Sequence, residues 1–107
     1  FLPLVPREQH VAQTLAVELY REGGIRSAEI GTLMADRDPV TRENRYPRVE
    51  YVRLAIPRRV YTDNHMLYTA VALARIFERR NFIRTGYSIV KEQPILRHFT
   101  VHLKPVG

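Results

Sequence analysis

Arg53 is the residue whose type and place in this sequence most suggest chemistry. It lies in the stretch Val49–Tyr61, where apolar residues alternate with others in the way that predicts a strand with one buried face. An arginine with aliphatic neighbours on both sides usually has a fixed anionic partner, because a guanidinium group away from water has to be paired. On the residues alone, an ion pair with an internal acid such as Glu50 or Glu29 would satisfy it equally well.

The other residues that commonly do chemistry form no recognisable site. His98 and His102 are the only histidines close in sequence, and four residues along a strand place them about 13 Å apart, too far to share a metal. Ser27 and Ser88 lie in strand-like segments without the turn that exposes a nucleophile. No glycine-rich phosphate loop occurs. We therefore expect no metal site and no complete active site in this chain.

Composition restricts the class of protein. The sequence has 107 residues, 45% of them hydrophobic, which suits one domain over residues 1–107. It has no cysteine, so we expect a reducing, cytoplasmic setting, and no apolar run approaches the length of a membrane span. The net charge is +6, but the basic residues are scattered among acidic ones. Because the chain opens at Phe1 with a proline-punctuated apolar segment, we interpret it as a fragment of a longer protein.

Periodicity predicts two helices and four strands. A helix over residues 7–22 is closed by two glycines, and a second begins at Thr62 or Asp63 and ends near Arg80. Strands are expected over residues 25–34, 49–56, 86–92 and 96–103, the second of them ended by Pro57, with a polar loop over 35–47. The sum predicts an α+β fold: a small antiparallel sheet with two main helices packed on one face.

Several motifs occur in a revealing order. They are Gly24–Gly31 (GIRSAEIG), Val52–Arg58 (VRLAIPR), Tyr61-Thr62, His65-Met66 and Leu96–Thr100 (LRHFT). In this order they closely resemble the C-terminal part of the β-eliminating amino-acid lyases, the pyridoxal-phosphate enzymes tryptophanase and tyrosine phenol-lyase. The resemblance covers nearly the whole chain and implies the C-terminal small domain of a fold-type I pyridoxal-phosphate enzyme.

The resemblance implies roles for three residues. Arg53 matches the family arginine that holds the substrate's α-carboxylate, which suits its forked pair of donors. Ile30 stands where phenol-lyases carry an arginine directed at the phenolic oxygen, and an aliphatic side chain there suits indole. His98 stands where tryptophanases have histidine and phenol-lyases phenylalanine, near the substrate ring. Without the resemblance, Ile30 would be interpreted as an ordinary core residue and His98 as a structural or surface histidine.

The implied reaction is α,β-elimination of L-tryptophan to indole, pyruvate and ammonia. Neither Lys91 nor Lys104 has the small-residue loop expected around the cofactor lysine, so pyridoxal phosphate should bind the large domain of the same chain and not this fragment. The fragment alone is expected to be inactive. The resemblance further implies a homotetrameric whole enzyme acting on an aromatic amino acid in aromatic amino-acid catabolism.

Three alternatives stay open at this stage. The substrate preference could be of the tyrosine phenol-lyase type, because only two positions favour tryptophan. The chain could instead be a small basic α+β module that binds nucleic acid, with Tyr46, Tyr51, Tyr61 and Tyr87 available for stacking. A third possibility is a standalone regulatory or oligomerisation remnant of a lyase gene.

Overall fold

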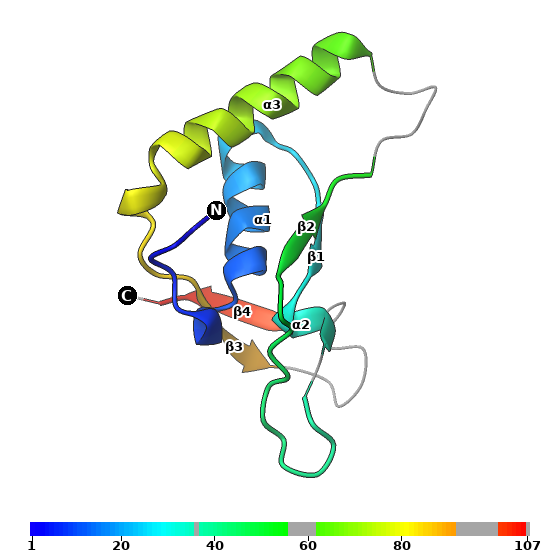
Figure 1. Cartoon of the computed structure of the whole chain (residues 1–107), viewed down its shortest axis with the longest axis vertical. Coiled ribbons are helices and arrows are strands. Elements are labelled where there is room, and N and C mark those ends of the chain that lie inside the picture. Colours follow the sequence, from blue (N-terminus) through cyan, green and yellow to red (C-terminus); the bar gives the residue numbers. More distant parts are fainter. Residues whose placement is uncertain (36, 56–61, 92–100, 107) are drawn as a thin grey trace.

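The fold was analysed in a computed structural model, which describes residues 1–35, 37–55, 62–91 and 101–106. The chain is α+β, as predicted (Figure 1). Its elements are η1 (Arg7–Gln9), α1 (Val11–Gly23), β1 (Ala28–Ile30), α2 (Thr32–Ala35), β2 (Tyr51–Arg53), α3 (Asp63–Glu78), η2 (Arg80–Phe82), β3 (Tyr87–Lys91) and β4 (His102–Pro105), where η marks a short 3-10 helix. Among the described helices, none has the length and apolar character that crossing a membrane requires.

The first predicted helix is present but begins later than expected. His10 has a left-handed backbone with φ 61°, which separates the single turn of η1 from α1. The other end agrees with the prediction: Gly24 takes φ 66°, and its N–H is donated to the carbonyl oxygens of Leu19 and Tyr20. Glycine adopts this conformation without the strain that a β-carbon would add, so it ends the helix here.

The second predicted helix, α3, has the expected ends but a different buried face. Thr62 accepts a hydrogen bond from the His65 backbone N–H, and the His65 ring accepts one from the Thr62 N–H, so a reciprocal cap begins the helix. We expected the apolar positions Met66, Ala70, Leu73, Ala74 and Phe77 to form the buried stripe; Leu73 is half-buried, but the other four are exposed. Ala72 and Ile76 are buried instead, because α3 packs mainly on α1 through that side.

The hydrophobic core lies where α1 and α3 meet the start of the chain. Its buried members are Leu2, Val5, Leu19, Ile76 and Ile83. The proline-punctuated apolar segment at the start of the chain therefore contributes two core residues. Val52 and Leu54 of the β2 region pack against the same cluster, which fixes one face of that strand to α1.

The strands form two separate two-stranded antiparallel sheets in place of the single sheet that was expected. In Figure 1, β1–β2 lies along one side of α1, and β3–β4 lies across the end of α1 where that helix begins. α1 contacts both β1 and β2, whereas α3 packs mainly on α1, so the two main helices do not share one sheet face.

All four predicted strands have different bounds from those observed. The strand expected to begin at Val49 is only Tyr51–Arg53 in the described part, and the one expected over residues 86–92 is Tyr87–Lys91. The segment over residues 25–34 is a strand only at Ala28–Ile30, because Thr32–Ala35 turns into the short helix α2. The last strand is His102–Pro105 and continues beyond the expected end at Leu103, while residues 96–100 of that prediction lie outside the described part. The loop prediction is confirmed from residue 37 onward, where a hairpin turn carries an isolated antiparallel bridge between Arg37 and Asn44.

Candidate functional site

The β1–β2 ribbon brings two of the three predicted site residues to one face. Its register pairs Ala28 with Arg53, Glu29 with Val52, and Ile30 with Tyr51. Directly opposed residues project to the same side and sides alternate along a strand, so Arg53 and Ile30 share a face as diagonal neighbours. Diagonal neighbours in such a pair lie about 7–8 Å apart, close enough for one small molecule to contact both. Ribbon pairing thus joins positions that are 23 residues apart in the sequence.

This face is the outer one. Val52 and Leu54 belong to the other parity and pack on the core, whereas Tyr51 and Arg53 are exposed, Tyr51 to 58%. The alternation predicted from the sequence is therefore confirmed over residues 51–55, and the predicted strand beyond residue 55 falls outside the described residues. Ile30 is half-buried and lies on the site face, not among the buried core residues.

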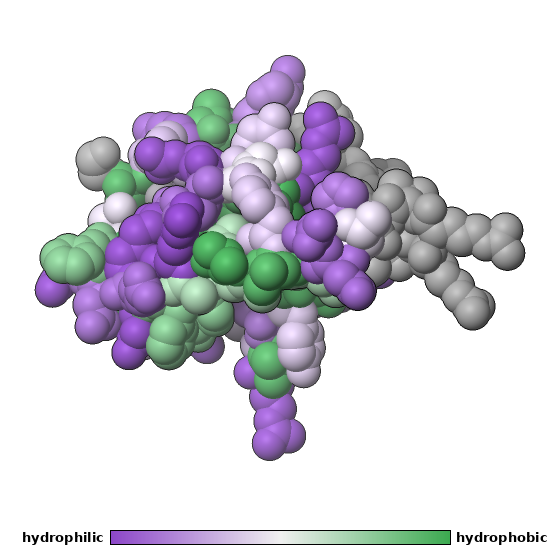
Figure 2. All heavy atoms as spheres, turned by 90° about the horizontal axis from the view of Figure 1, so that it is seen from above, coloured by the Kyte–Doolittle hydropathy of each residue, from purple (hydrophilic) through white to green (hydrophobic). Residues whose placement is uncertain are grey.

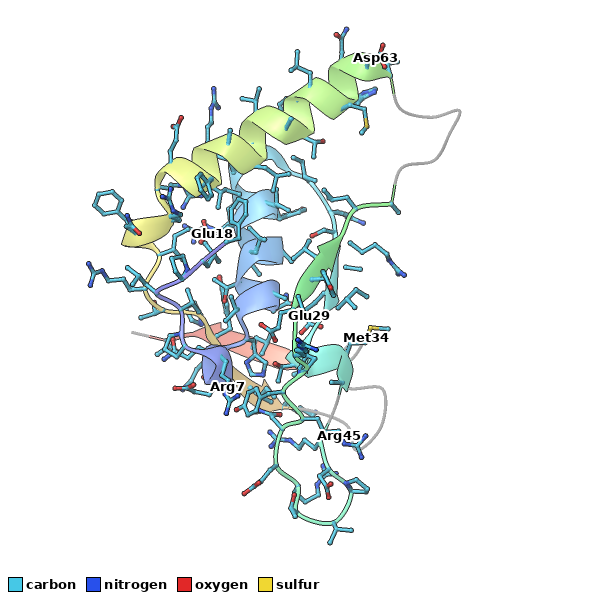
Figure 3. The ribbon with its side chains drawn as sticks, viewed as in Figure 1. Arg7, Glu18, Glu29, Met34, Arg45 and Asp63 are labelled. Atoms are coloured by element: carbon cyan, nitrogen blue, oxygen red, sulfur yellow. The ribbon has the colours of Figure 1, made fainter. Side chains whose placement is uncertain are left out.

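The two acids that could have paired with Arg53 are engaged elsewhere. Glu29 accepts hydrogen bonds from the backbone N–H groups of Gly31 at 2.7 Å, Leu33 at 2.8 Å and Met34 at 3.2 Å. Figure 3 shows Glu29 beside α2 accordingly. Glu50 likewise accepts from backbone groups of α1 and α2. Within the described part of the chain no carboxylate pairs with Arg53, so the internal ion pair is not formed there.

Sequence analysis did not foresee what these glutamates do. Each was considered only as a possible partner of Arg53, yet together they supply the N-terminal hydrogen bonds of α2. This is why Thr32–Ala35 is helical: free N–H groups at a helix start favour a nearby carboxylate. A signal was present in the sequence, because Gly31-Thr32 supplies two residue types that are preferred at the start of a helix.

None of the other predicted positions is placed on this face by the described part of the structure. His98 lies outside the described residues. Lys91 and Lys104 are exposed on the other ribbon, β3–β4. No cluster of potential metal ligands occurs among the residues that the structure describes.

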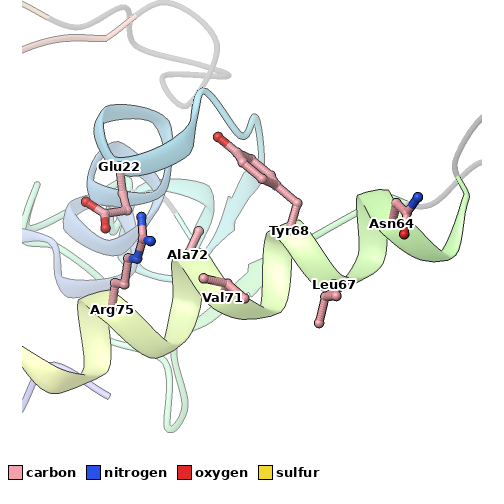
Figure 4. Close-up of a pocket in the computed structure, with 7 residues that line it drawn as sticks. All are labelled: Glu22, Asn64, Leu67, Tyr68, Val71, Ala72 and Arg75. Atoms are coloured by element: carbon pink, nitrogen blue, oxygen red, sulfur yellow. The ribbon is translucent and has the colours of Figure 1, made fainter.

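Two hollows of the described surface lie elsewhere. One of about 320 Å³ lies between the end of α1 and the part of α3 from Asn64 to Arg75, where the Tyr68 hydroxyl donates to the Gly23 carbonyl oxygen (Figure 4). The apolar lining of this hollow includes Leu67 and Val71. Figure 2, which views the molecule from the side of α3, shows apolar patches between polar side chains. A second hollow borders Arg26 and Ser27 before β1. Neither of these two hollows includes Arg53 or Ile30. Because Arg53 is exposed, the candidate site forms an open wall within the described part of the chain.

The basic residues are divided among separate contacts. Arg79 pairs with Glu18 at 2.8 Å, Arg7 lies over the Tyr46 ring at 4.3 Å, and Arg80 lies over the Phe77 ring at 3.8 Å. A nucleic-acid interface needs its cations gathered on one face beside exposed aromatic rings. These described contacts give no support to that alternative.

Comparison with known proteins finds relatives that match almost the whole chain. No family model matches the chain. A "Probable beta-eliminating lyase" of Trichomonas vaginalis is 61% identical over 94% of this chain and 22% of the relative. A tyrosine phenol-lyase of Symbiobacterium sp. is 46% identical over 100% of the chain and 23% of the relative, and a tryptophanase of Salinibacter ruber is 46% identical over 97% and 22%.

The chain therefore spans less than a quarter of the length of these relatives. The expected closer similarity to tryptophanase is not seen in the overall identities, since several tyrosine phenol-lyases match the chain as well as the tryptophanase does. At these identities, the 107 residues are similar to a segment of proteins named as β-eliminating lyase, tyrosine phenol-lyase and tryptophanase.

Proposed function

We propose that this chain supplies the substrate-carboxylate arginine and one wall of the aromatic pocket of a β-eliminating lyase. The observation that carries the proposal is the outer face of β1–β2, where Arg53 and Ile30 are diagonal neighbours and Arg53 has no carboxylate partner among the described residues. An exposed guanidinium whose nearby acids are already engaged is available for the carboxylate of a ligand.

Arg53 would fix the orientation of the amino acid. Its planar guanidinium can donate two parallel hydrogen bonds to the α-carboxylate, which a lysine cannot do. With the acid end held at Arg53, the side chain of an aromatic amino acid would extend along the same face toward Ile30. The wall is open, so a second part of the lyase polypeptide would have to enclose the substrate and exclude water.

The described residues do not fit the cofactor of this family, pyridoxal phosphate. The cofactor needs a lysine near the substrate, and Lys91 and Lys104 lie on the other ribbon. We therefore place the cofactor on the larger remainder of the lyase and derive no step through it from this chain. The 107 residues alone are expected to have no lyase activity.

For the substrate we propose L-tryptophan, with indole, pyruvate and ammonia as products. Ile30 supports this choice, because an aliphatic side chain leaves no hydrogen-bonding group for a phenolic hydroxyl and suits the larger apolar indole. L-tyrosine is the second candidate. The specific observation in its favour is the similarity to tyrosine phenol-lyases at 45% to 48% identity.

The proposal is tested by substitution at Arg53 in the full lyase polypeptide. For Arg53→Lys we expect the KM for the amino acid to rise and kcat/KM to fall roughly tenfold, because lysine keeps the charge but loses one of the two hydrogen bonds to the carboxylate, a loss of about 1.5 kcal/mol. Release of pyruvate and of indole or phenol measures the effect. Arg84→Ala is the matched control, since Arg84 is also exposed but lies away from this ribbon.

The same assay tests the substrate. Ile30→Arg should lower activity on L-tryptophan and raise the relative activity on L-tyrosine, because the new cation can pair with the phenolic oxygen. Unchanged kinetics for Arg53→Lys would remove the carboxylate role. An Ile30→Arg variant with unaltered preference would remove the pocket role.

A further inference from the structure

Glu50 stands immediately before β2 and joins three parts of the fold. Its Oε2 accepts a hydrogen bond from the backbone N–H of Ala12, in the first turn of α1, at 3.2 Å. Its Oε1 accepts from the backbone N–H of Thr32, the first residue of α2, at 2.9 Å, and also from the Thr32 hydroxyl. One carboxylate thus ties the strand that carries Arg53 to the beginnings of two helices.

The surroundings of this carboxylate are shaped for it. α1 receives no side-chain hydrogen bond from its own N-cap residue, His10, so the distant Glu50 supplies that contact. Gly31 is the position opposite Glu50, one step beyond the last pair of the ribbon. A β-carbon at residue 31 would lie 2.8 Å from Glu50 Oε1, closer than side chains pack. Glycine at position 31 therefore leaves the space that the carboxylate occupies.

The place of Arg53 depends on this anchor. The ribbon has only three residue pairs, and a two-stranded ribbon of this size is marginal by itself, so contacts outside the pairing must fix its register and tilt. Glu50 is three residues before Arg53 and belongs to the inner parity, together with Val52. Its contacts therefore set where the outer face, with Arg53 and Ile30, lies relative to α1.

We propose that Glu50 is a positioning residue for Arg53: through its hydrogen bonds to α1 and α2 it holds the guanidinium where a substrate carboxylate binds. The proposal rests on the carboxylate role of Arg53 proposed above. Charge matters, because helix N-termini favour an anion and all three donors point at acceptor-only oxygens. A glutamine would present an amide NH₂ to one of these N–H groups, so Glu50→Gln loses at least one of the contacts.

The test compares two inhibitors of the full lyase that differ only in the carboxylate. L-Phenylalanine carries the α-carboxylate, and 2-phenylethylamine is the same molecule without it. For Glu50→Gln we expect the inhibition constant of L-phenylalanine to rise about tenfold and that of the amine to change less than about twofold, the tenfold loss corresponding to about 1.4 kcal/mol. Glu43→Gln is the control, because Glu43 is exposed and its side chain accepts none of these helix contacts.

A double variant identifies the route of the effect. If Glu50 acts through Arg53, then Glu50→Gln combined with Arg53→Lys should bind L-phenylalanine no more weakly than Arg53→Lys alone. Additive losses, or equal losses for both inhibitors, would overturn the proposal and leave Glu50 as a stabilising residue only. If Arg53→Lys itself does not alter the preference for the carboxylate, the proposed function fails, which is a different result.

Two milder variants keep the test decisive if Glu50→Gln does not fold. Glu50→Asp retains the charge but shortens the reach, and Gly31→Ala pushes the intact carboxylate from its place. In both variants the inhibition constant of L-phenylalanine should rise about threefold, which is half of the tenfold effect on the logarithmic scale. The inhibition constant of the amine should not change. Unchanged binding of L-phenylalanine in both variants would also overturn the proposal.

Discussion

The two β-ribbons of this chain are similar units with different anchors. β1–β2 is held by carboxylates: Glu29 and Glu50 accept hydrogen bonds from backbone groups at the starts of α1 and α2. β3–β4 is held by an amide and an imidazole from adjacent residues, since Gln9 accepts from the Gly86 N–H at 2.8 Å and His10 Nδ1 lies 3.0 Å from the Tyr87 carbonyl oxygen. The ribbon that carries the candidate site is thus the one fixed by charge.

The difference indicates which kind of substitution each ribbon tolerates least. A carboxylate anchor should be sensitive to changes of charge and reach, because its contribution comes from hydrogen bonds to an ion. The anchor of β3–β4 should instead be sensitive to added volume, because Gly86, which donates to Gln9, has no free space beside its α-carbon. The predictions below test this contrast, beginning with the largest expected effect.

Gly86→Ala should be the most damaging single change at either ribbon. A β-carbon at residue 86 would lie 2.1 Å from the Gln9 carbonyl oxygen and 2.6 Å from Thr14 Oγ1, so η1 and β3 would have to separate. We expect the free energy of unfolding to fall by about 3 kcal/mol, near the upper end of the range for overpacking. Urea denaturation measures the loss.

Gly24→Ala is the matched control for that change. Gly24 has φ 66° but nothing within 4 Å of the added β-carbon, so only backbone strain applies. That strain costs about 1 kcal/mol. Equal losses for the two variants would show that β3–β4 is not held by close packing.

Removing the anchors themselves is the second test. Glu50→Ala deletes three hydrogen bonds to a half-buried charged group and leaves two helix starts without them, so we expect a loss of about 2 kcal/mol. Gln9→Ala deletes one neutral hydrogen bond and leaves the Gly86 N–H unpaired, a loss of about 1 kcal/mol. The shift in urea midpoint at constant slope gives both values. A larger loss for Gln9→Ala would reverse the comparison.

The same contrast explains how much of the fold could be predicted from the sequence. Helix periodicity and local caps depend on residues that are close in sequence. The end of α1 at Gly24 and the beginning of α3 after Thr62 were therefore both predicted. The helix α2 was missed, because one of the acids that supply its hydrogen bonds, Glu50, is 18 residues from Thr32. The buried side of α3 was predicted wrongly, because contact with α1, and not the apolar pattern of α3 alone, decides which of its residues are buried.

The candidate site shows the same limit. The alternation around Arg53 correctly predicted its parity, and Ile30 was identified by resemblance alone. That both lie on one outer face follows from the register of β1 with β2, which nothing in either segment specifies by itself. His98 stays a prediction, because it lies outside the described residues.

Helix α3 offers a third test, because its start is capped locally whereas α1 depends on the distant Glu50. Thr62→Ala removes the side-chain oxygen that accepts from the His65 N–H and should cost about 1 kcal/mol, the usual value for an N-cap. Thr85→Ala, at an exposed threonine outside any helix, is the control and should change little. A loss confined to α3, with hydrogen exchange in α1 unchanged, would confirm that the two helix starts are independent.

The smallest expected effect is at the turn that leads back from α2 to β2. Asp38 accepts hydrogen bonds from the N–H groups of Thr41 and Val40, and these bonds, with a smaller contribution from the Arg45 guanidinium, hold the pKa of Asp38 below its ordinary value. A lowered pKa means that the folded state favours the charged carboxylate. Its contribution to stability is therefore present above the ordinary aspartate pKa and is lost as the pH falls through the lowered one.

Titration of the Asp38 carboxyl by NMR should give a midpoint below about 3.9, the value of an unperturbed aspartate. Because the described hydrogen bonds of the Asp38 carboxylate lie within its own turn, the amide signals of Val40 and Thr41 should shift with it while those of Ala28 and Val52 do not. If the signals of β1 and β2 followed Asp38, the connecting turn would be setting the register of the ribbon. If the signals of β1 and β2 do not change as Asp38 titrates, the register of the ribbon is set by Glu29 and Glu50, whose hydrogen bonds reach the helices directly.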